Sequence, residues 1–343
     1  MTPAQLQIQL HAAFAHYQAG RTGEAAALCA RLRQPGQHVP VVWRLSGIVA
    51  LHQGRAAEAE AFLRAALKLD PRLHEVWDNL GYALQAQGRV ADAIACHEKA
   101  IALQPGFVDG WHNLGLALLF AGRPGDSLAA QERALALAPD LAPAHFGRAL
   151  ALQHCHRAAD AIAAYEAALA REPRHLGARS YRLLALNYLS SLTRAELFAE
   201  HERFGAALGP VRPRTFANPR RPERRLRVAF LSPDLRTHSV AYFLQPILRH
   251  LDAAEFEVFL YHDHFVVDQT SSQLRTLAAT WRNFSGLPAD TVERQILADA
   301  PDLLVDLAGH TGLNRLPLLA RRLAPVQIAY LGYPNTTGVR AVD

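Results

Sequence analysis

The stretch LRVAFLSPDLRTHSVAYFLQPILRHL runs from Leu226 to Leu251 and decides how the second half of the chain folds. It begins with a mostly apolar run, breaks at Ser-Pro-Asp, and resumes as an apolar pattern with helical spacing. This order predicts a strand, a turn and a helix. The turn carries a titratable ring, His238, with a hydroxyl-bearing residue on either side.

Three further strand-like runs follow, and helical patterns alternate with them. The runs cover residues 256–262, 302–310 and 326–333, and the helical patterns cover 239–251, 270–280, 291–300 and 315–323. Alternation at this spacing predicts a parallel, doubly wound sheet. Ligands of such sheets bind beyond the carboxyl ends of the strands. The histidines, hydroxyls and glycines of SPDLRTHS, HDHFVVD, GHTGLN and GYPNTTG fall at those ends, so we expect a site there.

The first half of the chain repeats itself every 34 residues. The positions that keep this step are Trp43, Trp77, Trp111 and His145; Pro71, Pro105, Pro139 and Pro173; and Gly20, Gly54, Gly88 and Gly122. The pattern resembles tetratricopeptide repeats, with five units over about residues 6–173. Units of this kind stack into a solenoid with a concave groove. In the last unit, histidines replace the tryptophan and the turn glycine, and we expect that unit to be less regular.

The groove of such an array binds extended protein segments. Asn79 and Asn113 occupy equivalent positions in their units, and an amide there can donate to and accept from a peptide backbone. We therefore predict that these two residues bind a peptide. A surface asparagine without a role is the alternative.

Three segments are expected along the chain. Residues 1–208 form the repeat array with its transition helices, residues 209–225 form a solvated, arginine-rich linker, and residues 226–343 form the α/β lobe. Thr193 and Glu196 have the spacing of a capping box, which places a helix start after Thr193.

The composition predicts a cytoplasmic protein. The start of the sequence is polar, no apolar run approaches the roughly 20 residues of a membrane span, and the three cysteines lack metal-type spacing. The net charge is +5, but only two of the basic residues are lysines, and aromatic residues do not alternate with the arginines of the segment 209–225. We therefore expect neither nucleic-acid nor membrane binding.

The repeats and the loop motifs together resemble the tetratricopeptide-containing O-GlcNAc transferases, including their Spindly-like branch. The motifs are RVAFLSPDLRTHSVAYFLQPIL, FEVFLYH, ILADAPDLLVDLAGHTGLNRL and RRLAPVQIAYLGYPNTTG. The resemblance implies two Rossmann-like lobes of the GT-B type and transfer of GlcNAc from UDP-GlcNAc to serine or threonine, with inversion, without a metal and without a cofactor. It also implies a protein acceptor in the repeat groove. The chain ends directly after a strand and its turn, so we expect the second lobe to be missing and nucleotide-sugar binding to be weak.

The resemblance also assigns residues. His238 corresponds to the active-site histidine of the first turn, where it acts as a general base or positions a substrate. Donor or acceptor contacts are implied for His310, Thr311, Gly332, Tyr333, Pro334, Thr336 and Thr337. Asn335 stands where the family usually has glycine, so the resemblance does not fix which sugar the donor carries.

Several alternatives remain at this point. His238 can be a helix-start residue without chemistry, with Ser239 capping the helix. His262 and His264 share a strand face but have no third metal ligand at suitable spacing. The protein can instead transfer fucose from a GDP donor, or act as a non-catalytic tetratricopeptide scaffold.

Overall fold

The computed structural model describes residues 1–211, 213–221 and 223–343. The chain divides into two compact units, residues 1–173 and 174–343. None of the helices in the described ranges is both long and apolar enough to cross a membrane.

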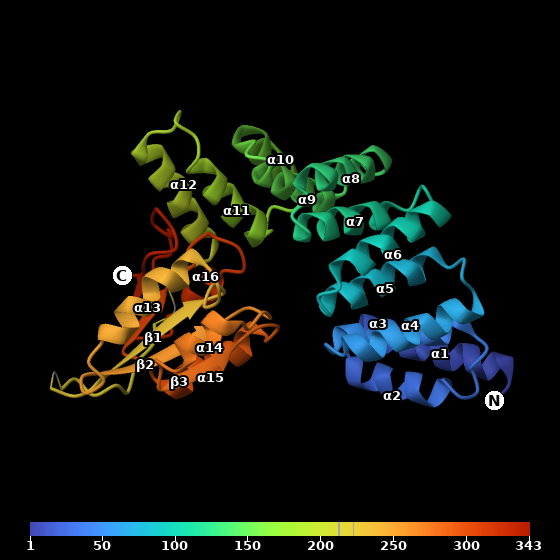
Figure 1. Ribbon diagram of the computed structural model, residues 1–343, viewed down its shortest axis with the longest axis horizontal. Helices are drawn as coiled ribbons and strands as arrows, with labels where there is room; N and C mark the ends of the chain where they lie inside the picture. Colours follow the sequence, from blue (N-terminus) through green and yellow to red (C-terminus); the bar gives the residue numbers. More distant parts are fainter. Residues whose placement is uncertain (212, 222) are drawn as a thin grey trace. The chain divides into compact units, whose positions relative to one another are not determined.

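The first unit consists of five helix pairs, as the 34-residue period predicts. Neighbouring helices lie side by side along the array (Figure 1). The helices are α1 (Pro3–Gln18), α2 (Thr22–Leu32), α3 (Pro40–His52), α4 (Ala56–Leu69), α5 (His74–Ala86), α6 (Val90–Leu103), α7 (Val108–Phe120), α8 (Pro124–Leu137), α9 (Ala142–His154) and α10 (Ala158–Arg171).

The four repeated glycines explain the turns inside the first four units. Gly20, Gly54, Gly88 and Gly122 all have φ between 73° and 77°, a conformation that glycine adopts without steric cost. In the fifth unit His156 takes over this left-handed conformation with φ 58°. Its helices α9 and α10 have 13 and 14 residues, the same lengths as α5 and α6. The expectation of a less regular fifth unit is therefore wrong.

The repeated tryptophans have a common hydrogen bond. The indole N–H of Trp43, Trp77 and Trp111 donates to the backbone carbonyl six residues earlier, over 2.9–3.0 Å. His145 stands at the corresponding position of the fifth unit, and its Nε2 lies 2.8 Å from the carbonyl oxygen of Pro139. The histidine thus supplies the donor that tryptophan supplies elsewhere, which is a physical reason for the regularity of that unit.

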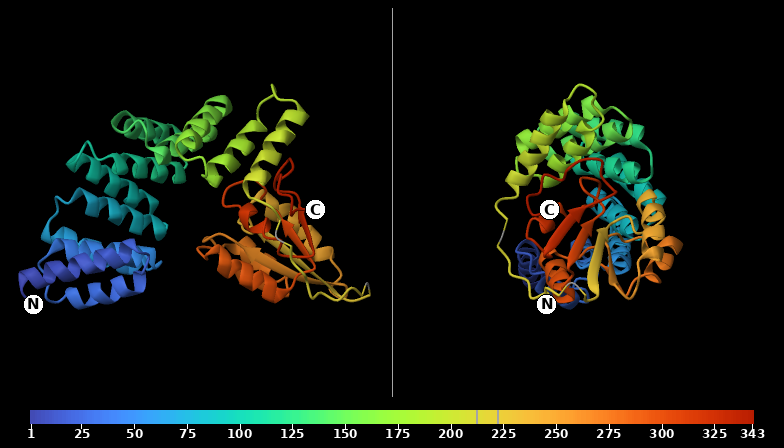
Figure 2. Two further views of the ribbon diagram at one scale, coloured as in Figure 1. Left: turned by 180° about the vertical axis from the view of Figure 1, so that it is seen from behind. Right: turned by 90° about the vertical axis from the view of Figure 1, so that its left-hand side faces the viewer.

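The second unit contains a parallel five-stranded sheet in the order β3-β2-β1-β4-β5. The strands are β1 (Leu226–Ser232), β2 (Phe256–His262), β3 (Thr280–Asn283), β4 (Leu303–Asp306) and β5 (Val326–Ala329), and the helices between them are α13 (Ser239–His250), α14 (Gln269–Arg275), α15 (Ala289–Asp299) and α16 (Leu316–Leu319). The predicted doubly wound sheet is confirmed (Figure 2). The strand order makes β3 an additional edge strand beside β2.

Helices cover both faces of this sheet. Residues from β1, β2 and β4 form one buried cluster with Leu244 of α13 and Leu274 of α14. On the opposite face the Tyr261 hydroxyl donates to Asp299 of α15 over 2.9 Å. The alternating side chains of the strands are therefore buried on both sides, as a parallel sheet requires.

Two helices that we expected to belong to the array group with the sheet instead. These are α11 (Leu176–Leu186) and α12 (Arg194–Ala207), and both fall in the unit that begins at Arg174. The capping box of α12 is present as predicted, with Thr193 accepting from Glu196. Their side chains reach the loops at the carboxyl edge of the sheet, for example from Ser180 to His310.

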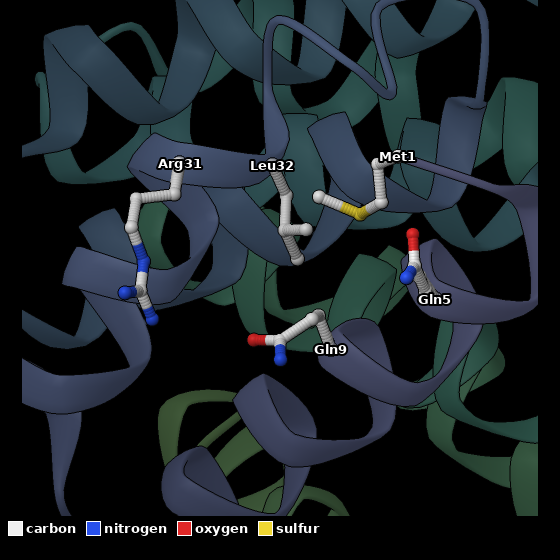
Figure 3. Close-up of a pocket in the computed structure, with 5 residues that line it drawn as sticks. All are labelled: Met1, Gln5, Gln9, Arg31 and Leu32. Carbon is white, nitrogen blue, oxygen red and sulfur yellow. The ribbon is translucent and has the colours of Figure 1, made fainter.

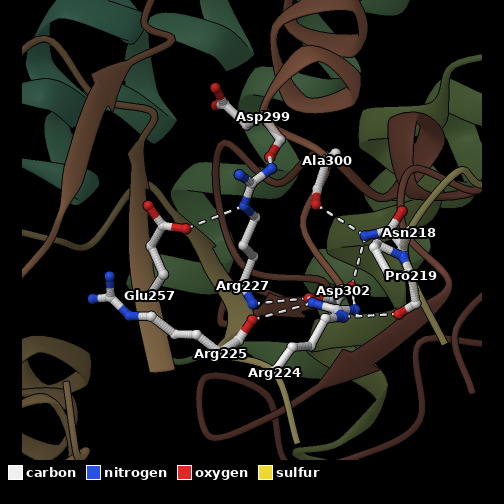
Figure 4. Close-up of polar contacts among 9 residues, drawn as sticks. All are labelled: Asn218, Pro219, Arg224, Arg225, Arg227, Glu257, Asp299, Ala300 and Asp302. Atoms are coloured by element: carbon white, nitrogen blue, oxygen red, sulfur yellow. Dashed lines mark hydrogen bonds and ion pairs between the residues drawn. The ribbon is translucent and has the colours of Figure 1, made fainter. Parts of the chain in front are cut away.

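The arginine-rich segment 209–225 was expected to be a solvated linker. Its residues 212 and 222 lie outside the described ones. Arg224 and Asn218 both donate to Asp302, over 2.6 Å each, and the backbone N–H of Arg227 donates to the same carboxylate over 2.9 Å (Figure 4). Arg214 pairs with Glu293 of α15. The described part of this segment is therefore bound to the lobe by buried and half-buried ion pairs.

Candidate active site

The loops that follow β1, β2, β4 and β5 lie at the carboxyl edge of the sheet, because these strands are parallel. They contain every predicted catalytic, donor-binding and acceptor-binding residue of the lobe. The structure divides these residues into two groups, one in the loops after β1 and β2 and one in the loops after β4 and β5.

His238 belongs to the first group and caps α13. Its Nδ1 accepts a hydrogen bond from the backbone N–H of Val240 over 3.2 Å. The ring is partly exposed, and Nδ1 lies 3.8 Å from a carboxylate oxygen of Asp234. The structure therefore shows His238, rather than Ser239, as the cap.

The loop that holds His238 is tied to the loop after β2. The carboxylate of Asp268 accepts from the backbone N–H of Thr237 over 2.7 Å, and the hydroxyls of Thr237 and Thr270 are 3.0 Å apart. Burial by itself raises the pKa of Asp268, but hydrogen bonds from Ser271 and Thr237 outweigh it and hold that pKa well below its usual range. Asp268 is therefore a fixed anion beside the turn.

His310 belongs to the second group and is fully buried. Its Nε2 lies 2.9 Å from the carbonyl oxygen of Thr337, and its Nδ1 lies 2.8 Å from the Ser180 hydroxyl. A carbonyl only accepts, so Nε2 carries the hydrogen and Nδ1 accepts from Ser180. Burial lowers the pKa of His310 to about 3, which keeps the ring neutral. Neither ring nitrogen is free for the ligand contact that we predicted.

Gly332 and Tyr333 lie in the loop after β5, which passes closely over the end of β4. A Cβ atom on Gly332 would lie 1.6 Å from the carbonyl oxygen of Leu307, so only glycine fits. The Tyr333 ring contacts Gly309 and His310, and the ring centroids of His310 and Tyr333 are 5.1 Å apart. The two loops therefore form one compact group.

Four other predicted residues lie in these two loops. The Thr311 hydroxyl donates to the carbonyl of Ala308 over 2.8 Å, and Pro334 is exposed. Thr336 and Thr337 each accept from a backbone N–H two residues later, and Thr337 is buried. Contacts of these residues with a substrate stay predictions.

Asp306 ends β4 and is buried at this edge of the sheet. Its carboxylate accepts from the backbone N–H of Gly309 over 2.7 Å and from that of Ala308 over 3.3 Å. Burial raises the pKa of Asp306 to about 6 against these two hydrogen bonds. Both partners are backbone groups of its own loop, as expected for a structural carboxylate.

His262 and His264 were considered as a metal pair. Nε2 of His262 lies 2.9 Å from the carbonyl oxygen of Val266, and Nδ1 of His264 accepts from the N–H of the same residue over 2.9 Å. Among the described residues, no group of three or more histidine, cysteine, aspartate or glutamate side chains is placed to hold a metal ion. Nδ1 of His262 is buried without a partner in the described part of the chain.

The two predicted peptide-binding asparagines have different surroundings. Asn113 is buried; its amide donates to Asp78 over 2.9 Å and accepts from the Tyr82 hydroxyl over 2.6 Å. Asp78 also lies 2.7 Å from Nδ1 of the buried His97. Asn79 is half-buried and has no hydrogen-bond partner within the described ranges. Because the Asn113 amide is occupied inside the array, only Asn79 is left for the predicted groove.

A pocket of about 400 Å³ lies at the start of the array (Figure 3). Met1, Gln5, Gln9, Arg31 and Leu32 line it, and none of the predicted site residues is among them.

Three residues of α11, α12 and the turn between them were missed by the sequence analysis. Ser180, Asn187 and His201 contact the loops after β4 and β5 from more than 100 positions away along the chain. The motif LLALNYLSSLTRAELFAEH contains two of them, but their spacing does not reveal which loop they reach.

Comparisons with known proteins also separate a repeat array from an α/β lobe. Residues 211–343 match the family described as glycosyl transferase family 41, and residues 15–73, 79–142 and 112–174 match a tetratricopeptide repeat family. The chain is similar to the tomato (Solanum lycopersicum) protein named probable UDP-N-acetylglucosamine–peptide N-acetylglucosaminyltransferase SPINDLY, with 34% identity over 164 residues. This match covers 46% of the chain and 18% of the tomato protein.

A Caenorhabditis elegans UDP-N-acetylglucosamine–peptide N-acetylglucosaminyltransferase is 31% identical over 123 residues, which are 35% of this chain and 11% of that protein. A solved mutant of the Thermobaculum terrenum O-GlcNAc transferase is 29% identical, with a TM-score of 0.75. It covers 80% of this chain, and the chain covers 53% of it. The chain thus spans about a fifth of the curated tomato relative and about half of this solved one.

Proposed function

This chain is homologous to the O-GlcNAc transferases, and we propose that the protein carrying it transfers N-acetylglucosamine from UDP-GlcNAc to serine or threonine hydroxyls of other proteins. The observation that carries the proposal is the match of residues 211–343 to glycosyl transferase family 41, on a sheet whose polar loops gather at its carboxyl edge. The repeat array supports a protein acceptor, because tetratricopeptide solenoids present a long concave surface. We also propose that the protein acts in the cytoplasm; its three free cysteines are consistent with a reducing compartment.

The proposed reaction is a single displacement with inversion. The acceptor oxygen forms a bond to the anomeric carbon while the bond from that carbon to the UDP oxygen breaks, and UDP leaves with the electron pair. The acceptor hydroxyl loses its proton to a base. We propose that no metal takes part, as the resemblance to the O-GlcNAc transferases implies.

His238 is the residue of the first loop that we propose to contact substrate. Because its Nδ1 accepts the hydrogen bond that caps α13, the neutral ring carries its hydrogen on Nε2. In this form Nε2 donates a hydrogen bond and does not accept a proton. A base role would need the other tautomer, in which the cap is lost. The hydrogen bond to Val240 therefore favours positioning of a substrate oxygen over general-base duty.

Substitutions of His238 in the complete gene product separate these roles. Asparagine is a good N-cap and keeps a hydrogen-bond donor, whereas alanine removes both, at a cost to the helix of about 0.5–2 kcal/mol. We expect H238N to retain most of the turnover and H238A to lose it. If H238N falls by about 10²–10⁴-fold together with H238A, His238 is the base.

The donor is tested by incubating the complete gene product with a candidate acceptor and either UDP-GlcNAc or GDP-fucose. Intact-protein mass spectrometry should show addition of N-acetylhexosamine. Transfer of fucose alone would show that the donor is GDP-fucose instead. If neither sugar is transferred, the alternative of a non-catalytic tetratricopeptide scaffold is favoured.

A further inference from the structure

The Tyr333 hydroxyl lies between Asn187, which follows α11, and His201 of α12. The side-chain amide of Asn187 donates to this oxygen over 2.7 Å. On the other side the oxygen lies 2.7 Å from Nε2 of His201. A single hydroxyl from the loop after β5 therefore contacts two segments of the helical hairpin, which consists of α11, α12 and the turn between them (residues 176–207).

The direction of each hydrogen bond follows from the neighbours. Nδ1 of His201 lies 2.7 Å from the carbonyl oxygen of Leu197, which can only accept, so Nδ1 carries the hydrogen. Nε2 then accepts from the Tyr333 hydroxyl. Burial lowers the pKa of His201 and raises that of Tyr333, so the ring stays neutral and the hydroxyl stays protonated at neutral pH.

Two further contacts hold the same loop. The side-chain amide of Asn335 donates to the Asn187 side-chain oxygen over 3.2 Å. The backbone of Gly338 passes so close to α12 that a Cβ atom on Gly205 would lie 1.7 Å from the Gly338 carbonyl oxygen. Asn335, which departs from the usual glycine of the resembled family, thus has a definite partner in the helical hairpin.

We infer that Asn187 and His201 are positioning residues that hold the loop 330–338 in one arrangement at the carboxyl edge of the sheet. Neither residue is expected to touch substrate; both act through Tyr333 and, for Asn187, through Asn335. The inference rests on the proposed function, because the loop borders the substrates only if the edge is the active site. The helical hairpin thus contributes to the active site by fixing the position of the loop 330–338.

The loop itself is tested by hydrogen–deuterium exchange on the chain of residues 1–343. Tyr333→Phe keeps the ring and removes the one hydroxyl that reaches both Asn187 and His201. We expect amide exchange in 330–338 to become about tenfold faster, since two hydrogen bonds are lost, while exchange in α13 is unchanged. Tyr188→Phe is the matched control, because Tyr188 is 69% exposed, and it should leave exchange unchanged.

Asn187→Ala tests the hairpin side of the same contact and should accelerate exchange in the same loop. If neither Tyr333→Phe nor Asn187→Ala changes exchange in 330–338, the inference is overturned, whatever the activity of the protein.

The positioning role is tested with the complete gene product. We expect Tyr333→Phe and Asn187→Ala to raise the KM for UDP-GlcNAc about fivefold to tenfold and to leave the KM for the acceptor unchanged. Faster loop exchange with an unchanged donor KM would overturn the positioning role. If the wild-type protein transfers no sugar while the loop still loosens, the proposed function has failed and the anchoring of the loop stands.

Discussion

The Ser180 hydroxyl of α11 donates a hydrogen bond to Nδ1 of His310, 2.8 Å away, and so joins the helical hairpin to the loop after β4. The same hydroxyl accepts from Asn314 over 3.1 Å. All of these groups are buried or half-buried, and the bond closes a chain that runs from Ser180 through His310 to the carbonyl of Thr337.

Replacing Ser180 by alanine should therefore destabilise the second unit. Nδ1 of His310 would be left buried without a donor, which costs about 1–3 kcal/mol. Urea denaturation followed by circular dichroism measures the free energy of unfolding. Ser190→Ala, at an exposed position after the same helix, is the control and should change it by less than about 0.5 kcal/mol. Equal stability of the two variants would contradict the role given to Ser180.

The two equivalent asparagines of the array should respond differently to alanine. Asn113→Ala leaves a carboxylate oxygen of Asp78 and the Tyr82 hydroxyl without their partner, so we expect a loss of about 1–3 kcal/mol. Asn79→Ala removes no hydrogen bond of the described structure and should leave the melting temperature unchanged. If Asn79 binds a peptide backbone, its variant should weaken the acceptor by about 0.5–1.5 kcal/mol, or several-fold.

Scanning calorimetry and acceptor titration measure these two effects separately. Unchanged acceptor affinity in Asn79→Ala would show that Asn79 does not bind the acceptor peptide. A stable Asn113→Ala would show that the buried network does not support the array.

Gly332 should not tolerate a side chain. The Cβ of Gly332→Ala would overlap the Leu307 carbonyl oxygen, which is backbone and cannot turn away. We expect a loss of about 1–3 kcal/mol or more and faster amide exchange in 330–338. Gly125→Ala is the control, because space around Gly125 is open and it lies in helix α8. A fully stable Gly332→Ala would mean that the end of β4 is less tightly covered than the structure shows.

Acidification should weaken the second unit through His310. The pKa of this ring is about 3 in the folded protein and near 6.5 in the unfolded chain, so the unfolded state takes up a proton first. The contribution of the neutral His310 ring to the free energy of unfolding is complete above pH 6.5. It is lost as the pH falls from about 6.5 to about 3. Asp306 acts in the opposite sense: its raised pKa of about 6 means that its destabilising effect fades as the pH falls through about 6 toward about 4.

The His310→Asn variant isolates the first effect. Its free energy of unfolding should fall less steeply between pH 6.5 and pH 4 than that of the wild-type protein, because the titrating ring is gone. Urea titrations at several pH values measure the slope. Identical slopes in the two proteins would show that His310 does not govern the acid response.

The fold was predictable where the signal is local. The 34-residue period and the alternation of strands and helices depend on residues close together in the sequence, and both gave the observed elements. β3 was missed because Thr280–Asn283 is a short edge strand without apolar alternation, and the predicted helix before it extended to residue 280. In the structure α14 ends at Arg275.

The sequence predicted where the candidate site lies but not which residues contact one another there. The sequence put polar residues at the carboxyl edge, and the structure places them there. The partners of those residues depend on contacts between distant positions, such as Tyr333 with His201, 132 residues apart. An apolar face on α11 or α12 shows that the helix is buried but not what covers it. For the same reason the helical hairpin was assigned to the array, and the buried state of Asn113 could not be foreseen.

The hydrogen bond from each repeated tryptophan reaches back only six residues, to the loop between its own helix pair and the preceding one, so it joins neighbouring units. The histidine of the fifth unit follows the same rule. Because the acceptor is a backbone carbonyl at the same place in each of these loops, a duplication or deletion of one whole 34-residue repeat keeps a donor and an acceptor at every remaining junction. What must be preserved at this position is an N–H donor on a ring, and the gene can change both the ring and the number of units without losing it.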